Sequence, residues 1–212
     1  MAAHPLARRG VVLLEPALLP ALVPDRWDDA GDVAGVRLVK AGGHTEGSRP
    51  ILLAPAAELA GAARRLASEG AAALIFVGTC VSPTRMLEPG DVLVADRWRS
   101  AAGEGIANPA MANKLANRCL RRGLKVHRGV VASGGVRAAS GDAAEDTETA
   151  RVLAACAEAD VPAGALLVCA SVEARAGTEA PAAVLEAFDR LFGVVQEILG
   201  SARTPTVGSP SS

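Results

Sequence analysis

The feature that most constrains this chain is a regular alternation of short apolar runs with longer helical patterns. Two of the runs, Ala73–Gly78 and Ala165–Ala170, are apolar at every position, which is typical of strands that are covered on both faces. The strongest helical pattern is Pro181–Leu199, where large apolar residues recur every three or four positions. We therefore expect an α/β domain, built as a three-layer sandwich around a mixed, mostly parallel central sheet.

The expected elements cover most of the chain. Strands are expected at Val11–Leu14, Val36–Val39, Ile51–Ala54, Ala73–Gly78, Val92–Ala95, Val126–Ala132 and Ala165–Ala170, and helices at Pro55–Glu69, Pro109–Arg122, Ala144–Asp160 and Pro181–Leu199. The segment Asp25–Asp32 has the composition of a solvated loop. Residues 1–200 are predicted to form one domain, followed by a disordered tail over residues 201–212, which is rich in Pro, Ser and Gly.

Charge and composition argue against several classes of partner. Twenty-two basic and twenty-three acidic residues give a net charge of −1, so no basic field is available to hold nucleic acid. The apolar runs are too short for a membrane span. The four cysteines lie far apart without a C-x-x-C pair, which argues against a zinc site and fits reduced, buried thiols. We expect a cytoplasmic protein without metal or cofactor.

In α/β sheets, ligands bind beyond the carboxyl ends of the strands. Three apolar runs end in small or hydroxyl residues: Gly78, Thr79 and Cys80 in the first, Ser133 and Gly134 in the second, and Ser171 in the third. Such residues let a ligand approach the backbone and offer hydrogen bonds. They are also ordinary turn residues, so any one of these loops has a purely structural explanation.

Taken in order, three stretches resemble the nucleoside phosphorylase and nucleosidase superfamily. "IFVGTCVSPTRMLEPGDVLVAD" (Ile75–Asp96) is similar to a strand ending in G-[ST]-A-G-G-L, followed by a strand that opens with G-D. "HRGVVASGG" (His127–Gly135) is similar to R-G-x-x-x-S-G-D. "EDTETARVLAACAEADVPAGALLVCAS" (Glu145–Ser171) is similar to the E-M-E-A-x-A helix, its V-P turn and the strand that leads to an S-D pair.

The resemblance implies a nucleoside phosphorylase-like fold with a cleft for a purine nucleoside or a nucleoside-like small molecule. It places Thr147 and Glu148 at the ribose hydroxyls, where a carboxylate accepts two hydrogen bonds and stabilises a sugar that becomes cationic. The alternative for Glu148 is an acid favoured by the dipole at the start of a helix. Members of this superfamily commonly assemble with active sites near subunit boundaries, so a homo-oligomer is expected.

The departures from the family pattern fall on the chemistry. The purine-protonating Asp has no counterpart, because the matching positions are Ala170–Ser171 or, with a slip of one residue, Ser171–Val172. Ser171 and Glu173 are the candidates to replace it, and an exposed loop acid is the alternative for Glu173. Glu15 is the candidate to activate water, although alignment places it a few residues early.

The anion-binding loop of the family is also altered. Its place is taken by "LAPAAELAG" (Leu53–Gly61), in which Pro55 lacks an N–H and Glu58 adds negative charge. Hydrolysis of a nucleoside is therefore favoured over phosphorolysis. The alternative is a family fold used differently, either for another reaction of small-molecule biosynthesis or for ligand binding without turnover.

Overall fold

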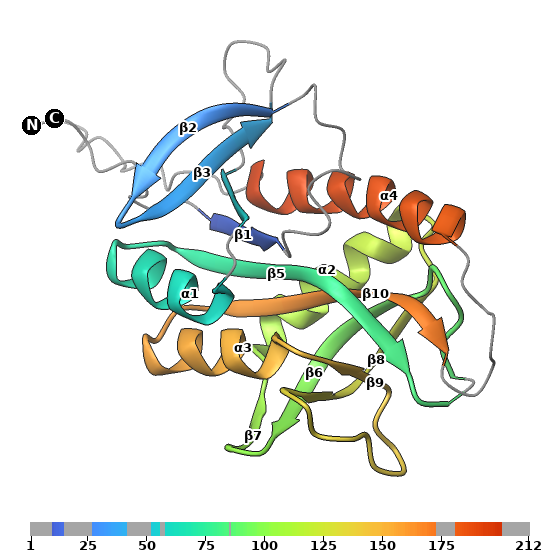
Figure 1. Ribbon diagram of the computed structural model, residues 1–212. Helices are drawn as coiled ribbons and strands as arrows, with labels where there is room; N and C mark the ends of the chain where they lie inside the picture. The colour runs from blue at the N-terminus through green and yellow to red at the C-terminus, as the bar shows by residue number, and fades with distance from the viewer. Residues whose placement is uncertain are drawn as a thin grey trace, which may run out of the picture.

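The computed structural model describes residues 10–14, 27–41, 52–55, 58–84, 86–172 and 181–200, drawn in colour in Figure 1. The strands are β1 (Gly10–Leu14), β2 (Trp27–Val33), β3 (Val36–Ala41), β4 (Leu52–Pro55), β5 (Ala73–Ser82), β6 (Val92–Ser100), β7 (Gly103–Ile106), β8 (Val126–Ser133), β9 (Ala144–Asp146) and β10 (Ala163–Val172). The helices are α1 (Leu59–Ser68), α2 (Pro109–Arg121), α3 (Thr149–Glu158) and α4 (Pro181–Gly200).

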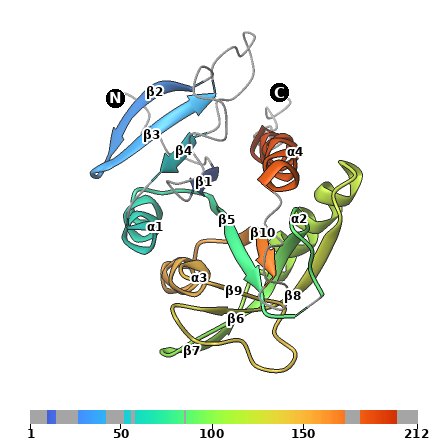
Figure 2. The same cartoon turned by 45° about the vertical axis from the view of Figure 1, so that its right-hand side comes forward.

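Five of the strands close into a barrel-like ring. β5 pairs with β10, β10 with β6, β6 with β8, β8 with β9, and β9 returns to β5. Outside the ring, the sheet extends from β5 through β1, β4, β3 and β2, as the upper part of Figure 2 shows, and β7 pairs with β6. The sheet is therefore continuous, but one part of it is closed and the other is open.

Strand direction in this sheet corrects the predicted architecture. Among the strands that the structure describes, five pairings are parallel and five are antiparallel. The sheet is mixed, as expected, but it is not mostly parallel, and its closed part is not a flat sandwich layer. β6 causes part of this difference, because it runs antiparallel to β10 and parallel to β8.

Helices cover the sheet from two sides (Figure 2). On one side Leu66 of α1 and Val152 of α3 pack in the apolar cluster that includes Phe76 of β5. On the other side Leu115 of α2 and Phe188 of α4 pack in a second apolar cluster. Burial on both faces explains why β5 and β10 are apolar at nearly every position, since neither face meets water.

The observed element boundaries differ from the predicted ones in several places. The helix expected from Pro55 begins only at Leu59, because Pro55 ends β4, and the strand expected to end at Ala95 continues to Ser100. β5 continues through Ser82, so the Gly78–Cys80 segment lies within a strand and not in a loop. The helix expected from Ala144 begins only at Thr149, because Ala144–Asp146 forms β9. The expected loop over Asp25–Asp32 is wrong from Trp27 onward, where β2 pairs antiparallel with β3.

The four cysteines are all buried, and none is in a disulfide, as predicted. No helix in the described ranges is long and apolar enough to cross a membrane. The predicted tail, residues 201–212, lies outside the described residues.

Candidate functional site

The carboxyl ends of β5 and β10 lie side by side in register. Thr79 is opposite Val168, Cys80 is opposite Cys169, and Val81 is opposite Ser171. The register shifts by one residue between Cys169 and Ser171, which is a β-bulge at the end of β10. Two of the segments that the sequence singles out, Gly78–Cys80 and Ser171, are therefore brought together on neighbouring strands.

β8 and β9 bring the other predicted residues to the same region. Ser133 is opposite Asp146, and the backbone N–H of Gly134 donates to the carbonyl of Asp146 at 3.1 Å. Glu145 is opposite Val81 of β5, which closes the ring. The segment Thr147–Glu148 leads directly from β9 into α3, so it lies next to the end of β5.

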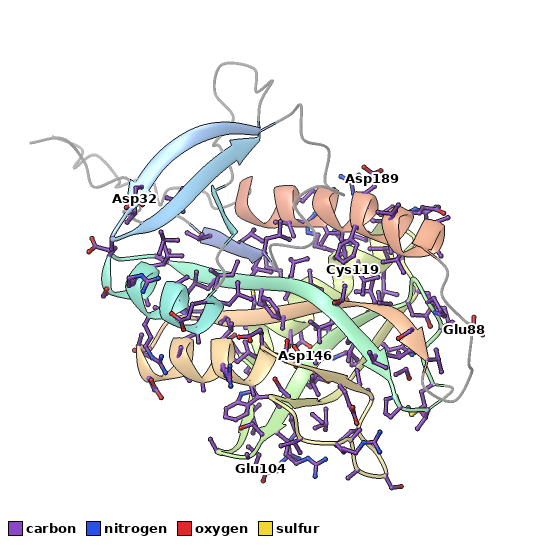
Figure 3. The ribbon with its side chains drawn as sticks, viewed as in Figure 1. Asp32, Glu88, Glu104, Cys119, Asp146 and Asp189 are labelled. Atoms are coloured by element: carbon purple, nitrogen blue, oxygen red, sulfur yellow. The ribbon has the colours of Figure 1, made fainter. Side chains whose placement is uncertain are left out.

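Asp146, labelled in Figure 3, accepts several hydrogen bonds in this region. Its Oδ2 accepts hydrogen bonds from the backbone nitrogens of Thr149 (2.8 Å) and Glu148 (3.4 Å) and from the Thr149 hydroxyl. The buried hydroxyl of Ser133 also donates to this carboxyl group. Burial nevertheless raises the pKa of Asp146 above its ordinary value, in spite of these donors.

Sequence reasoning did not select Asp146 as a site residue. The expectation of a helix from Ala144 placed it inside a first turn, where an acid needs no special explanation. The available signal was an Asp at the end of a strand, three residues before a Thr, which is a common way to begin a helix.

Glu148 occupies the N-cap position of α3, but its side chain makes no capping hydrogen bond. Its carboxylate lies 3.7 Å from the guanidinium of Arg151, and the Glu148 side chain is 28% exposed. Glu148 therefore lies at the helix start, where the dipole favours an acid, but the side chain that caps α3 is that of Asp146. Thr147, beside it, is exposed.

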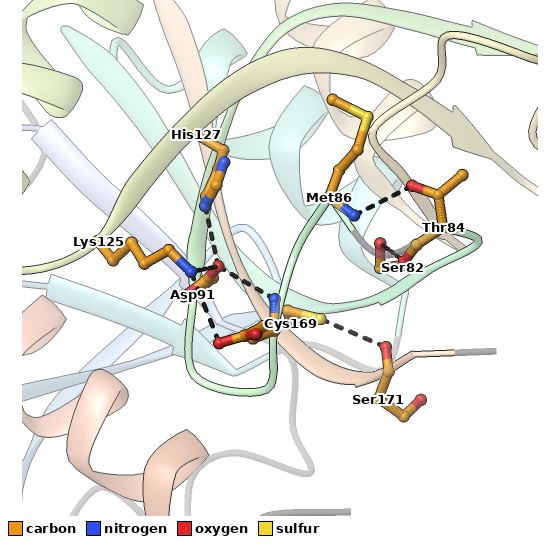
Figure 4. A network of polar contacts seen from close by, with 9 residues as sticks. Ser82, Thr84, Met86, Asp91, Lys125, His127, Cys169 and Ser171 are labelled. Carbon is orange, nitrogen blue, oxygen red and sulfur yellow. Dashed lines mark hydrogen bonds and ion pairs between the residues drawn. The ribbon is translucent and has the colours of Figure 1, made fainter. Parts of the chain in front are cut away.

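The thiols of Cys80 and Cys169 contact each other across the two strands. A hydrogen bond between them raises the pKa of Cys80 and lowers the pKa of Cys169. The Cys169 thiol also contacts the carbonyl oxygen of Ser171 at 3.3 Å, as Figure 4 shows. Cys80 is thus fixed in the interior, in contact with the strand that carries Ser171.

The end of β10 offers no carboxylate at the described positions. Ser171 is partly exposed and Val172 is buried, so Val172 packs in the core. Glu15 and Glu173 lie outside the described residues, and their predicted roles stay predictions.

Asp91, the acid of the G-D pair directly before β6, has a structural role (Figure 4). The buried Asp91 accepts hydrogen bonds through Oδ2 from Lys125 Nζ and His127 Nε2, both at 2.9 Å, and from the backbone nitrogen of Glu88 at 3.0 Å. Its backbone carbonyl accepts from the N–H of Cys169, also at 2.9 Å. Asp91 therefore fastens the start of β6 to the end of β10, beside the candidate site.

The amino terminus of α1 is already occupied by a carboxylate of the chain. Glu58 is the N-cap residue, and its Oε1 accepts from the backbone nitrogen of Gly61 at 2.7 Å. A Cβ on Gly61 would overlap this carboxylate. The positive end of the helix dipole, which would attract a phosphate, is therefore neutralised.

Two cavities in the described part of the chain lie away from these residues. One of about 260 Å³ is bordered by Asn108, Leu153 and Pro162, and one of about 210 Å³ by Asp91, Lys125 and Arg190. Neither is lined by a predicted site residue. The candidate site is therefore defined by the registers of β5, β8, β9 and β10.

This geometry defines a class of fold, namely a closed five-stranded ring with helices on both sides. Comparison with solved structures identifies it as the fold of nucleoside phosphorylases and nucleosidases, which confirms the resemblance at the level of fold. No protein-family model matches the sequence, and no curated protein matches it.

Three solved structures illustrate the similarity. The P. knowlesi homologue of P. falciparum PNP superposes with a TM-score of 0.73 at 15% identity, over 94% of this chain and 93% of the other. A protein from Weissella paramesenteroides that is assigned as a methylthioadenosine nucleosidase gives a TM-score of 0.71 at 15% identity, over 92% of this chain and 98% of the other. Futalosine hydrolase of Helicobacter pylori gives 0.66 at 15% identity, over 91% and 99%.

Proposed function

We propose that this protein cleaves the N-glycosidic bond of a purine nucleoside or a nucleoside-like metabolite. The observation that carries the proposal is the position of Glu148. Its carboxylate is partly exposed and makes no capping bond, and it stands where β9 enters α3, beside the ends of β5 and β8. A carboxylate in that position is suited to hold two ribose hydroxyls.

The fold supports the same class of reaction. Purine nucleoside phosphorylases, a methylthioadenosine nucleosidase and a futalosine hydrolase share it over nearly the whole chain. The Gly78–Cys80 and Ser133–Gly134 segments border the same region and are the proposed contacts for the rest of the ligand. A homo-oligomer and a small-molecule ligand are part of this proposal.

Hydrolysis is favoured over phosphorolysis. Glu58 occupies the amino terminus of α1 with its own carboxylate, and a phosphate there would meet negative charge. Water, which is neutral, meets no such repulsion.

The end of β10 favours a second candidate function. Ser171 and Val172 bring no carboxylate to the place where the family holds its acid, so the fold is also suited to bind a nucleoside-like ligand without cleaving it. Pro55, which ends β4, removes a further backbone donor from the former anion loop.

The test is incubation of the purified protein with a panel of purine nucleosides, including adenosine and methylthioadenosine, with and without phosphate. Free base together with a reducing sugar supports hydrolysis, and a sugar phosphate formed only with phosphate contradicts it. Calorimetric binding without product supports the second candidate. Folded protein that neither binds nor cleaves any member of the panel contradicts both.

A further inference from the structure

The two oxygens of Asp146 have very different surroundings. The hydrogen bonds that the carboxylate accepts from Glu148 and Thr149 all end on Oδ2. Oδ1 is buried and has no hydrogen-bond partner among the described residues. A buried carboxylate oxygen without a donor is costly when it carries charge, and a proton on that oxygen removes the charge.

We propose that Asp146 is the proton donor to the leaving base, in place of the acid that β10 lacks. The inference rests on the proposed function. The neutral carboxyl carries its proton on Oδ1, while Oδ2 serves as the carbonyl oxygen that caps α3. This arrangement keeps an acid un-ionised inside the protein without disturbing the helix that it begins.

The position of Asp146 fits this role. It is two residues before Glu148 on the same segment, and it is the register partner of Ser133 on β8. It also interacts electrostatically with Cys80 on β5. The proposed ribose contact and the proposed acid therefore stand at the same strand-to-helix junction, next to the strand β9 that pairs with both β5 and β8.

The groups that surround Asp146 are consistent with a neutral acid. The thiol of Cys80 faces it from β5, in contact with the Cys169 thiol of β10, and α3 contributes the carboxylate of Glu148, which is paired with Arg151. Glu145 precedes Asp146 on β9 and accepts the backbone N–H of Ala138. Burial raises the pKa of Asp146 and outweighs the hydrogen bonds from Thr149, Ser133 and Glu148, which lower it.

The proposed step is balanced in atoms and charge. The bond between the anomeric carbon and the base nitrogen breaks, and its electron pair goes to the base. The proton of Oδ1 passes to a ring nitrogen of that base, and water bonds to the anomeric carbon. The proton that this water loses restores the acid, so the net reaction consumes one nucleoside and one water and yields free base and free sugar.

The test compares two leaving groups in one protein preparation. Adenosine needs a proton for its base to depart, whereas the nitrophenolate of 4-nitrophenyl riboside departs without one. In Asp146→Asn, kcat/KM for adenosine is expected to fall by about 10²- to 10⁴-fold while that for the nitrophenyl riboside is retained. Asn keeps an oxygen that caps the helix, and the ratio of the two constants does not depend on how much protein is folded.

Glu145→Gln is the matched control, because it neutralises the neighbouring carboxylate on β9, and both constants are expected to stay unchanged. Asp146→Glu is expected to restore part of the adenosine activity. Equal losses on both substrates in Asp146→Asn, or no loss on either, would overturn the role of Asp146 and leave the proposed function standing. Wild-type protein that cleaves neither substrate would overturn both.

Discussion

Asp146 and Thr149 form the first bonds of α3: the carboxylate accepts the backbone N–H of Thr149 at 2.8 Å and also its hydroxyl. Glu148 lies between them in sequence, and its side chain takes no part in the cap. Two acids at one helix start thus have different surroundings. The side chain of Asp146 caps the helix, and that of Glu148 is partly exposed.

The first prediction separates these two acids by stability. Glu148→Ala is expected to change the free energy of unfolding by no more than about 0.5 kcal/mol, because its side chain does not cap α3 and its contact with the exposed Arg151 is long. Asp146→Ala removes a cap and is expected to cost about 1–2 kcal/mol. Urea denaturation of both variants measures the difference. Equal losses would show that Glu148 also supports the helix.

Ligand binding, unlike stability, should depend strongly on Glu148. Calorimetric titration of adenosine and methylthioadenosine is expected to lose its signal in Glu148→Ala, since the proposed ribose contact is removed. Retained affinity in this variant would place the ribose elsewhere.

The second prediction concerns pH and stability. The pKa of Asp146 is raised in the folded protein above its ordinary value of 3.8, so folding binds a proton that the unfolded chain releases. Its contribution is fully present below pH 3.8 and is lost as pH rises through the folded pKa. The difference in unfolding free energy between wild type and Asp146→Asn should therefore shift against wild type as pH increases above 4. A difference that is independent of pH, or that shifts toward wild type, would contradict the assigned direction.

The third prediction concerns Asp91. Its carboxylate is buried, but its partners Lys125 and His127 are 58% and 26% exposed, so neither becomes an unpaired buried charge when Asp91 is changed. Asp91→Asn should therefore cost about 1–3 kcal/mol, the scale of lost hydrogen bonds, and not the larger cost of an orphaned buried ion. Chemical denaturation measures it. Glu158→Gln, which breaks an exposed pair with Arg64, is the control and should change little.

The sequence predicted the elements whose signals are local. α2 and α4 lie within a residue of their expected bounds, because apolar residues repeat along their own helices. Ring closure was not predictable in this way. It depends on the three residues of β9, too few to show a period, and on the antiparallel β6–β10 pairing, which joins segments about 70 residues apart.

The same difference between local and long-range signals applies to the candidate site. Gly78, Ser133 and Glu148 were selected through ordered motifs, and the registers bring their segments together. Asp146 was missed because it stands out only in the folded protein, where Oδ2 is hydrogen-bonded and Oδ1 is buried without a partner among the described residues. No spacing of residues encodes that difference.

The fourth prediction concerns the paired thiols. Cys80 and Cys169 are register partners on parallel strands, whose spacing of about 4.8 Å falls within the range of about 4.4–6.8 Å between the Cα atoms of disulfides. Cys119 and Cys156 lie on separate helices, and burial raises the pKa of each to about 12. Diamide, which takes up two hydrogens from two thiols, should therefore join Cys80 to Cys169 alone.

Peptide mapping by mass spectrometry, after alkylation of the remaining thiols in denaturant, detects this cross-link directly. Cys119 and Cys156 should be recovered alkylated, and Cys80→Ser should abolish the cross-linked peptide while leaving those two unchanged. Because the Cys169 thiol also contacts the Ser171 carbonyl at 3.3 Å, the new bond should disturb the end of β10, and ligand binding should weaken until a reductant is added. Recovery of all four cysteines alkylated after diamide treatment would show that the two strands do not let the sulfur atoms approach.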